Sequence, residues 1–118
     1  MKLRSEYTCP LELTHDIIRG KWKPIILWQL GKGATSLAKL EKDIVGIGQK
    51  MLLQHLDELQ SFNIVEKKQF EGYPLRVEYS LTSRGKRMLD IVVSMQEIGI
   101  EIMKEDGKEA FLKEKGLI

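Results

Sequence analysis

The segment SLAKLEKDIVGIGQKMLLQHLDELQSF, residues 36–62, decides the architecture of this chain. Ser36, or Thr35 before it, can cap a short helix through Ile44, because either hydroxyl can accept a hydrogen bond from a first-turn N–H. The two glycines that follow favour a tight turn. From Gln49 to the end of the segment, leucines recur every three or four residues, which predicts a second helix with one apolar side.

The residues before this segment predict two more helices. Pro10 suits a first helical position, where its missing N–H costs nothing, and Gly20 ends a helix over residues 10–19. Residues 22–30 carry large apolar side chains around most of the circumference and stop at Gly31. This pattern indicates a mostly buried helix.

The residues after the segment predict a β-hairpin. Residues 64–70 are strand-like, residues 71–74 form a turn, and residues 75–81 return. The return strand alternates polar residues with the apolar Leu75, Val77, Tyr79 and Leu81. One face of this strand is therefore expected to be buried and the other exposed.

A long helix is expected from Thr82 or Ser83 to about Glu105, followed by a weaker helical segment over residues 106–115. The complete order is helix, helix, short helix, turn, helix, hairpin and long helix. This order is typical of a winged helix-turn-helix, in which the hairpin is the wing. The predicted fold class is therefore α+β, mainly α.

At 118 residues the chain is long enough for one domain, which we expect to span residues 1–118. Residues 10–82 would form its DNA-binding core. Residues 1–19 and 83–118 would supply dimerisation elements.

Charge is segregated along the chain. The net charge of +2 is a weak signal for nucleic-acid binding, but residues 19–50 carry seven basic side chains and only two acidic ones. Residues 88–118 carry seven acidic and four basic side chains. The first stretch can face phosphates, whereas the last is not expected to contact DNA. The other interpretation is that both are ordinary solvated surfaces.

The composition disfavours several other classes of protein. Cys9 is the only cysteine, and His15 and His55 lie too far apart for zinc-site spacing, so we expect neither a disulfide nor a metal. No phosphate-binding loop or nucleophile motif occurs, so we expect no enzyme and no cofactor. No long apolar run or signal-like N-terminus occurs, which favours a cytoplasmic protein without membrane contact.

The second helix of the central segment is the predicted recognition helix. Its N-terminal polar residues, Gln49, Lys50 and Gln54, would enter the major groove, with Leu53 and Asp57 nearby. Glutamine amides can read a base with two hydrogen bonds, and lysine can donate to guanine or to a phosphate. The alternative is plain solvent exposure on an amphipathic helix.

Two further places can contact the DNA backbone. Arg76 lies on the polar face of the return strand, within reach of a phosphate or the minor groove; the alternative is a cross-strand pair with a glutamate such as Glu66. Ser36 and Lys39 lie at the start of the short helix, where N–H groups favour a phosphate. Helix capping alone accounts equally well for Ser36.

The long helix carries an apolar set too wide for one core-facing stripe, so a second surface must cover it. A second copy of the same helix, together with the N-terminal helix, would do so in a two-fold dimer. Residues 106–118 folding back are the alternative. A dimer would read an inverted repeat. The predicted interface residues are Leu11, Met88, Ile91, Val92, Met95, Ile98 and Ile102.

Four short motifs resemble the HxlR-type family of bacterial winged-helix regulators. They are Cys9-Pro10, GKWK with ILW over residues 20–28, GIGQKML over residues 46–52, and RVEYSLT over residues 76–82. The resemblance spans roughly residues 7–100. It implies a homodimeric DNA-binding regulator of nearby genes, a repressor by preference, with Gln49, Lys50 and Gln54 on the recognition helix and Arg76 in the wing.

The chain departs from the family pattern in two places. Gly48 stands where the family usually has a capping serine, and Asp57 stands where a basic residue is common. A weaker cap and reduced phosphate contact are expected there.

The resemblance also implies that Cys9 can sense oxidants or electrophiles, as in several family members. The start of a helix stabilises a thiolate, although Glu12, one turn further on, opposes this effect. The alternative is a small hydrophobic residue packed in the dimer interface.

Together these features predict a transcription regulator that binds double-stranded DNA, with a small-molecule or oxidant effector still to be identified. The main rival is a winged-helix module that binds another protein and never contacts DNA.

Overall fold

The computed structural model describes residue 3 and residues 5–118. Residues 1, 2 and 4 of the expected N-terminal dimerisation element therefore lie outside the described residues. The elements, in chain order, are α1 (Pro10–Ile18), α2 (Trp22–Leu30), α3 (Leu37–Asp43), α4 (Gln49–Ser61), β1 (Val65–Phe70), β2 (Arg76–Leu81), α5 (Ser83–Glu105) and α6 (Glu109–Glu114). The predicted α+β, mainly helical winged helix-turn-helix is confirmed.

A helical head built from α2, α3 and α4 contains most of the core. The predicted apolar side of α4 packs inward, and Leu52, Leu56 and Leu59 have no exposed surface. Ile26 and Leu27 of α2 are equally buried, as its all-round apolar sequence predicted. At the start of α3, the Ser36 hydroxyl accepts a hydrogen bond from the Lys39 N–H at 3.2 Å. Ser36 is therefore the helix cap.

Thr35, the other predicted cap, has a different role. Its backbone exchanges two hydrogen bonds with Tyr79 of β2, at 3.0 and 2.8 Å, and so adds a single bridge beside the hairpin. This bridge holds the start of α3 against the base of the wing.

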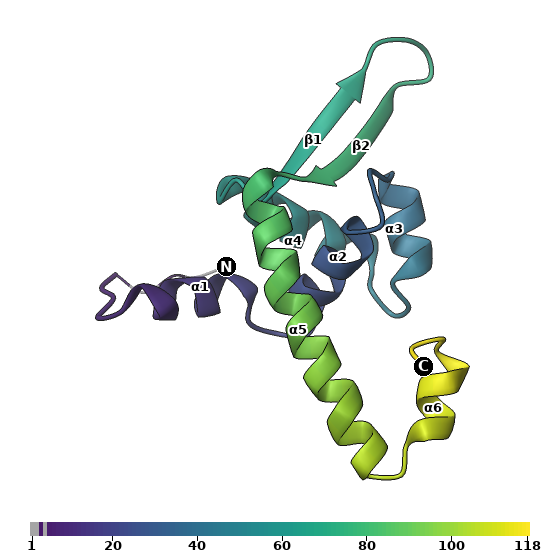
Figure 1. Ribbon diagram of the computed structural model, residues 1–118. Coiled ribbons are helices and arrows are strands. Elements are labelled where there is room, and N and C mark those ends of the chain that lie inside the picture. The colour runs from purple at the N-terminus through teal and green to yellow at the C-terminus, as the bar shows by residue number, and fades with distance from the viewer. Residues whose placement is uncertain (1–2, 4) are drawn as a thin grey trace.

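The wing is an antiparallel pair in which Val65 lies opposite Leu81 and Phe70 lies opposite Arg76. The predicted alternation holds at its base, where Tyr79 and Leu81 are buried. It fails at Leu75, which was expected to be buried and is 63% exposed. The outer half of the hairpin extends beyond the helices (Figure 1), which accounts for the exposure of Leu75.

A compact junction joins the wing, α4 and α5. The Thr82 hydroxyl accepts a hydrogen bond from the Gly85 N–H at 3.0 Å and donates to the Asn63 carbonyl oxygen at 2.7 Å. Arg84 donates to the Phe62 carbonyl oxygen at 2.8 Å. A Cβ at Gly85 would lie 2.1 Å from the Ile64 carbonyl oxygen. Only glycine allows α5 to approach β1 this closely.

Helix α5 packs its first half on α2 and then runs away from the head (Figure 1). Met88 and Val92 were predicted at a dimer interface, but both are buried in the core of the single chain. Val92 lies beside α2, whereas Met88 lines a groove between α5 and α1. Their part in a dimer interface stays a prediction. Among the described residues, no helix is long and apolar enough to cross a membrane.

The chain turns after α5, and α6 folds back alongside it (Figure 1). Leu112 of α6 is completely buried. The alternative that residues 106–118 fold back is therefore correct for one side of α5. A second side remains uncovered in the single chain.

The close approach at Gly85 generates a stability prediction. Gly85→Ala should lower the free energy of unfolding by about 2 kcal/mol, because the added methyl group overlaps the Ile64 carbonyl. Gly99→Ala is the matched control: a Cβ at Gly99 meets no atom within 4 Å, and alanine should raise stability by about 0.5–1 kcal/mol through helix propensity. Urea denaturation measures both changes. Equal effects of the two substitutions would contradict the role given to Gly85.

Candidate nucleic-acid interface

The outer face of α4 is polar and exposed. Gln49, Lys50 and Gln54 are all exposed; Lys50 and Gln54 lie on the side away from the buried leucines, and Gln49 is the first residue of the helix. Leu53, between them, is half-buried. The helix begins after Gly48, which makes no side-chain cap. The predicted recognition residues are thus all accessible in the N-terminal half of α4, with Lys50 and Gln54 on one face.

An ion pair fastens α4 to α2. The Lys23 ammonium lies 2.5 Å from a Glu58 carboxylate oxygen, and their side chains are only 4% and 15% exposed. Burial by itself would raise the pKa of Glu58, but hydrogen bonds, with that from Lys23 first among the described residues, lower it to about 2. Glu58 is therefore ionised at neutral pH, as a buried lysine partner must be.

Sequence reasoning missed this pair and counted Lys23 among the basic residues that could face phosphates. The structure corrects that: Lys23 is buried and directed into the protein. Lysine and glutamate are surface residues by default, and their 35-residue separation leaves no local signal.

The pair also orients part of the recognition surface. Gln54 donates from Nε2 to the other Glu58 carboxylate oxygen at 3.3 Å, one helical turn further on. His55 is half-buried beside this site, and burial, followed by the charge of Lys23, lowers its pKa. Its imidazole is therefore neutral at neutral pH and adds no charge to α4.

The start of α3 provides a second polar surface. Ser36 is half-buried and occupied by its capping bond, while Lys39 is exposed and pairs with Asp43 at 2.9 Å. The pKa of Asp43 is lowered, chiefly by the hydrogen bond from Lys39. Exposed pairs of this kind contribute little to stability, so Lys39 can exchange Asp43 for a phosphate at small cost.

On the wing, Arg76 is exposed and its guanidinium lies 4.2 Å from the centroid of the Phe70 ring. The possible pair with Glu66 is wrong, because Glu66 lies opposite Ser80 and its carboxylate accepts a hydrogen bond from the Ser80 hydroxyl at 3.2 Å. Stacking on an aromatic ring does not use the N–H donors of an arginine. Arg76 can therefore hold a phosphate while it rests on Phe70.

Cys9 is exposed and occupies the N-cap position of α1, directly before Pro10. The Thr8 hydroxyl donates to the Glu12 carboxylate in the same turn. The alternative that Cys9 packs in a dimer interface stays a prediction, because its exposure is that of a single chain. Among the described residues, no group of three or more histidine, cysteine, aspartate or glutamate side chains could hold a metal ion.

A short supporting helix, a tight turn, a second helix with an exposed polar face and an adjoining hairpin define a winged helix-turn-helix protein. Residues 17–107 match the HxlR-like helix-turn-helix family. The chain belongs to this family, and the resemblance found in its motifs is confirmed.

Two curated relatives cover most of the chain. The putative regulatory protein MalR of Fusobacterium mortiferum is 38% identical over 86% of this chain and 96% of its own length. An uncharacterised HTH-type transcriptional regulator of Bacillus subtilis, YkvN, is 35% identical over 80% of each chain.

Solved structures share the fold. The redox regulator HypR in its reduced form superimposes with a TM-score of 0.77 at 34% identity, covering 86% of this chain and 99% of that one. Diamide-treated YodB of Bacillus subtilis gives a TM-score of 0.70 at 28% identity, covering 81% and 96%.

Proposed function

We propose that this chain regulates transcription as a homodimer that binds an inverted repeat in double-stranded DNA, and that it represses the genes it controls. It acts by binding and not by catalysis. The observation that carries this proposal is the exposed face of α4, where Lys50 and Gln54 stand opposite the buried leucines and Gln49 is exposed as the first residue of the helix. A helix presented in this way fits the major groove.

Each polar surface has a distinct task in this proposal. Gln49 and Gln54 read base edges, and Lys50 donates to a guanine or a phosphate. Lys39 at the start of α3 and Arg76 on the wing hold phosphates on either side, with Ser36 keeping the first turn of α3 in place. Phosphate contacts set the position on the duplex, and base contacts supply the sequence preference.

Titration of the protein into labelled fragments of the DNA upstream of its own gene tests which residues contact bases and which contact phosphates. Gln54→Ala should weaken binding to the preferred site roughly tenfold and leave binding to a scrambled duplex unchanged. Lys39→Ala should weaken both and reduce the slope of log affinity against log salt by about 0.9 per neutralised phosphate. Lys113→Ala, an exposed lysine on α6, is the matched control and should change neither.

Salt-independent binding, or no binding even at low salt, would contradict the proposal. The chain would then fit the rival interpretation, a winged helix that docks on another protein.

The homodimer is proposed from an uncovered stripe on α5. Ile91, Met95, Ile98 and Ile102 are each about half exposed and recur at steps of four, three and four residues. This spacing places them along one side of the helix, as in a helix–helix seam. In a two-fold homodimer the same surface of both subunits meets, so the stripe of a second copy is the expected partner.

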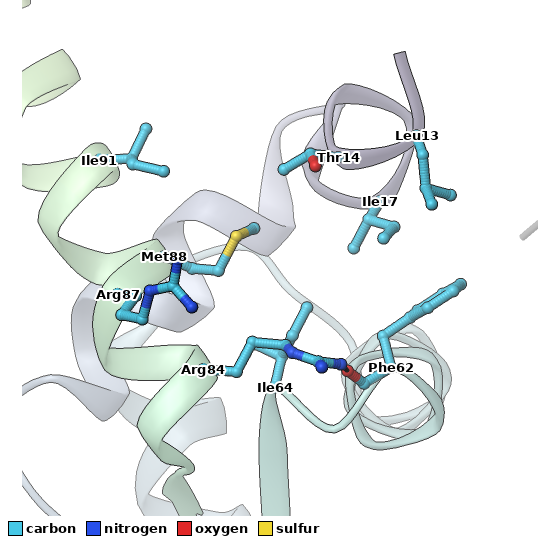
Figure 2. A pocket seen from close by; sticks show the side chains of 9 residues that line it. All are labelled: Leu13, Thr14, Ile17, Phe62, Ile64, Arg84, Arg87, Met88 and Ile91. Atoms are coloured by element: carbon cyan, nitrogen blue, oxygen red, sulfur yellow. Dashed lines mark hydrogen bonds between the residues drawn. The ribbon is translucent and has the colours of Figure 1, made fainter. Parts of the chain in front are cut away.

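Helix α1 extends this surface. It projects from the body of the molecule, and its Leu11 is 72% exposed (Figure 1). Between α1 and α5 lies an open groove of about 540 Å³, into which Leu13 and Ile17 point from one side and Met88 from the other (Figure 2). We infer that side chains of the partner fill it.

A charge in the stripe should break such a dimer. Ile98→Glu would bring two carboxylates together across the two-fold axis, so we expect a monomer in sedimentation velocity and at least tenfold weaker binding to the inverted repeat. Lys104→Glu, on the opposite side of α5, should remain dimeric. A dimer that survives Ile98→Glu would place the interface elsewhere.

We further propose that oxidation or electrophilic modification of Cys9 changes the affinity for DNA. The support is that Cys9 is exposed at the start of α1, a helix in the proposed dimer surface, and that one structural neighbour is titled a redox regulator. Two copies can join their Cys9 thiols in one disulfide, losing two protons and two electrons to the oxidant.

Diamide should therefore shift the DNA affinity of the wild-type protein at least fivefold, and dithiothreitol should restore it. Cys9→Ser should not respond. Because Cys9 is the only cysteine, dithiothreitol reversal separates thiol chemistry from methionine oxidation. An equal response from Cys9→Ser would leave Cys9 with a packing role only.

A further inference from the structure

A second groove lies on the other side of α5, enclosed by α2, α5 and α6. Its volume is about 640 Å³, within the range of small-molecule sites. Its walls are apolar and include two aromatic rings, Trp28 from α2 and Phe111 from α6, and the flexible side chain of Met103. A groove of this size and lining suits an apolar organic molecule.

This groove is distinct from the proposed dimer surface. Helix α5 lines the groove with residues that each directly follow a member of the exposed stripe: Val92, Gln96, Gly99 and Met103. One residue corresponds to about 100° of rotation, so the two surfaces face different directions. Only Met95 borders both.

Helix α6 builds the outer wall. Leu112 is fully buried and anchors the helix, while Phe111 and Lys115 lie in the groove lining. The Leu117 N–H donates to the Leu112 carbonyl oxygen at 2.9 Å and closes the segment. This wall lies beyond residue 107, where the family match ends.

The lining contains a single charged group. Lys115 places its ammonium 5.8 Å from the centroid of the Phe111 ring, and the amides of Gln29 and Gln96 are the other strongly polar groups. Among the described lining residues, none is acidic, and Lys115 is the one charged side chain. One cation at the edge of an apolar lining complements a molecule with an apolar body and one negative charge.

We propose that the α2–α5–α6 groove binds a small aromatic carboxylate, with its ring between Trp28 and Met103 and its carboxylate on Lys115. The floor at Gly99 is open, since a Cβ there meets no atom within 4 Å, so a ring can lie against α5. This site goes beyond the proposed function and does not depend on DNA binding.

The occupant would contact a helix that also supports the recognition surface. Helix α2 lines the groove with Pro24, Ile25 and Trp28 and holds α4 through Lys23 and Glu58. The groove and the DNA-facing helix thus share one nine-residue element.

Isothermal titration of the full chain with 1-naphthoate tests the site. We expect saturable binding of one molecule per chain, at least fivefold weaker binding of the neutral 1-naphthalenemethanol, and none of 1-naphthylmethylammonium. Lys115→Gln should remove the preference for the acid over the alcohol, whereas Lys113→Gln should leave it unchanged.

Gly99→Leu is the blocking variant. Its side chain would fill the floor of the groove, so naphthoate affinity should fall at least tenfold, while the better helix propensity of leucine keeps the chain folded. Its DNA binding and sedimentation should match wild type, which separates a failure of this site from a failure of the proposed function.

Three results would overturn the proposal. They are no saturable naphthoate binding, binding that Gly99→Leu leaves intact, and equal affinity for acid and alcohol in the wild-type chain. A Gly99→Leu variant that turns a dimer into a monomer would assign the groove to contact between copies and would equally reject a ligand site.

Discussion

The contact between Gly85 and the backbone of Ile64 is the constraint on which the rest of the structure depends. Here the end of α4, the start of β1 and the first turn of α5 converge within a few residues, joined by the Thr82 hydroxyl and by Arg84. Backbone groups cannot be repacked as side chains can, so this contact fixes the angle at which α5 leaves the head. The directions of the wing and of the exposed stripe on α5 follow from that angle.

Much of the fold could be predicted because its signals are local. Proline at the start of α1, the serine cap of α3, the leucine spacing in α4 and the alternation in β2 each depend on residues a few positions apart. The errors arose where the outcome depends on distant packing. Leu75 alternates correctly but lies beyond the part of the hairpin that the helices cover. Met88 and Val92 are buried in the core of the single chain, which sequence spacing alone does not reveal.

The candidate site likewise has features with a local sequence signal and features without one. The exposure of Lys50 and Gln54 follows from the periodicity of α4, and that of Gln49 follows from its place as the first residue of the helix. The Lys23–Glu58 pair, which fastens this helix to α2, had no sequence signal because both residue types normally lie in solvent. The sequence left open whether Arg76 pairs with Glu66, and the register of β1 and β2 answers this. Arg76 stacks on Phe70, while Glu66 accepts a hydrogen bond from Ser80.

The attachment of α6 has a consequence for dynamics. A six-residue helix held by one fully buried side chain, Leu112, has little packing energy of its own and should open by local unfolding, with a free energy well below that of the whole domain. Its amide protons would then exchange long before those of α2 or α4. The outer wall of the adjacent groove would then open and re-form independently of the DNA-facing head.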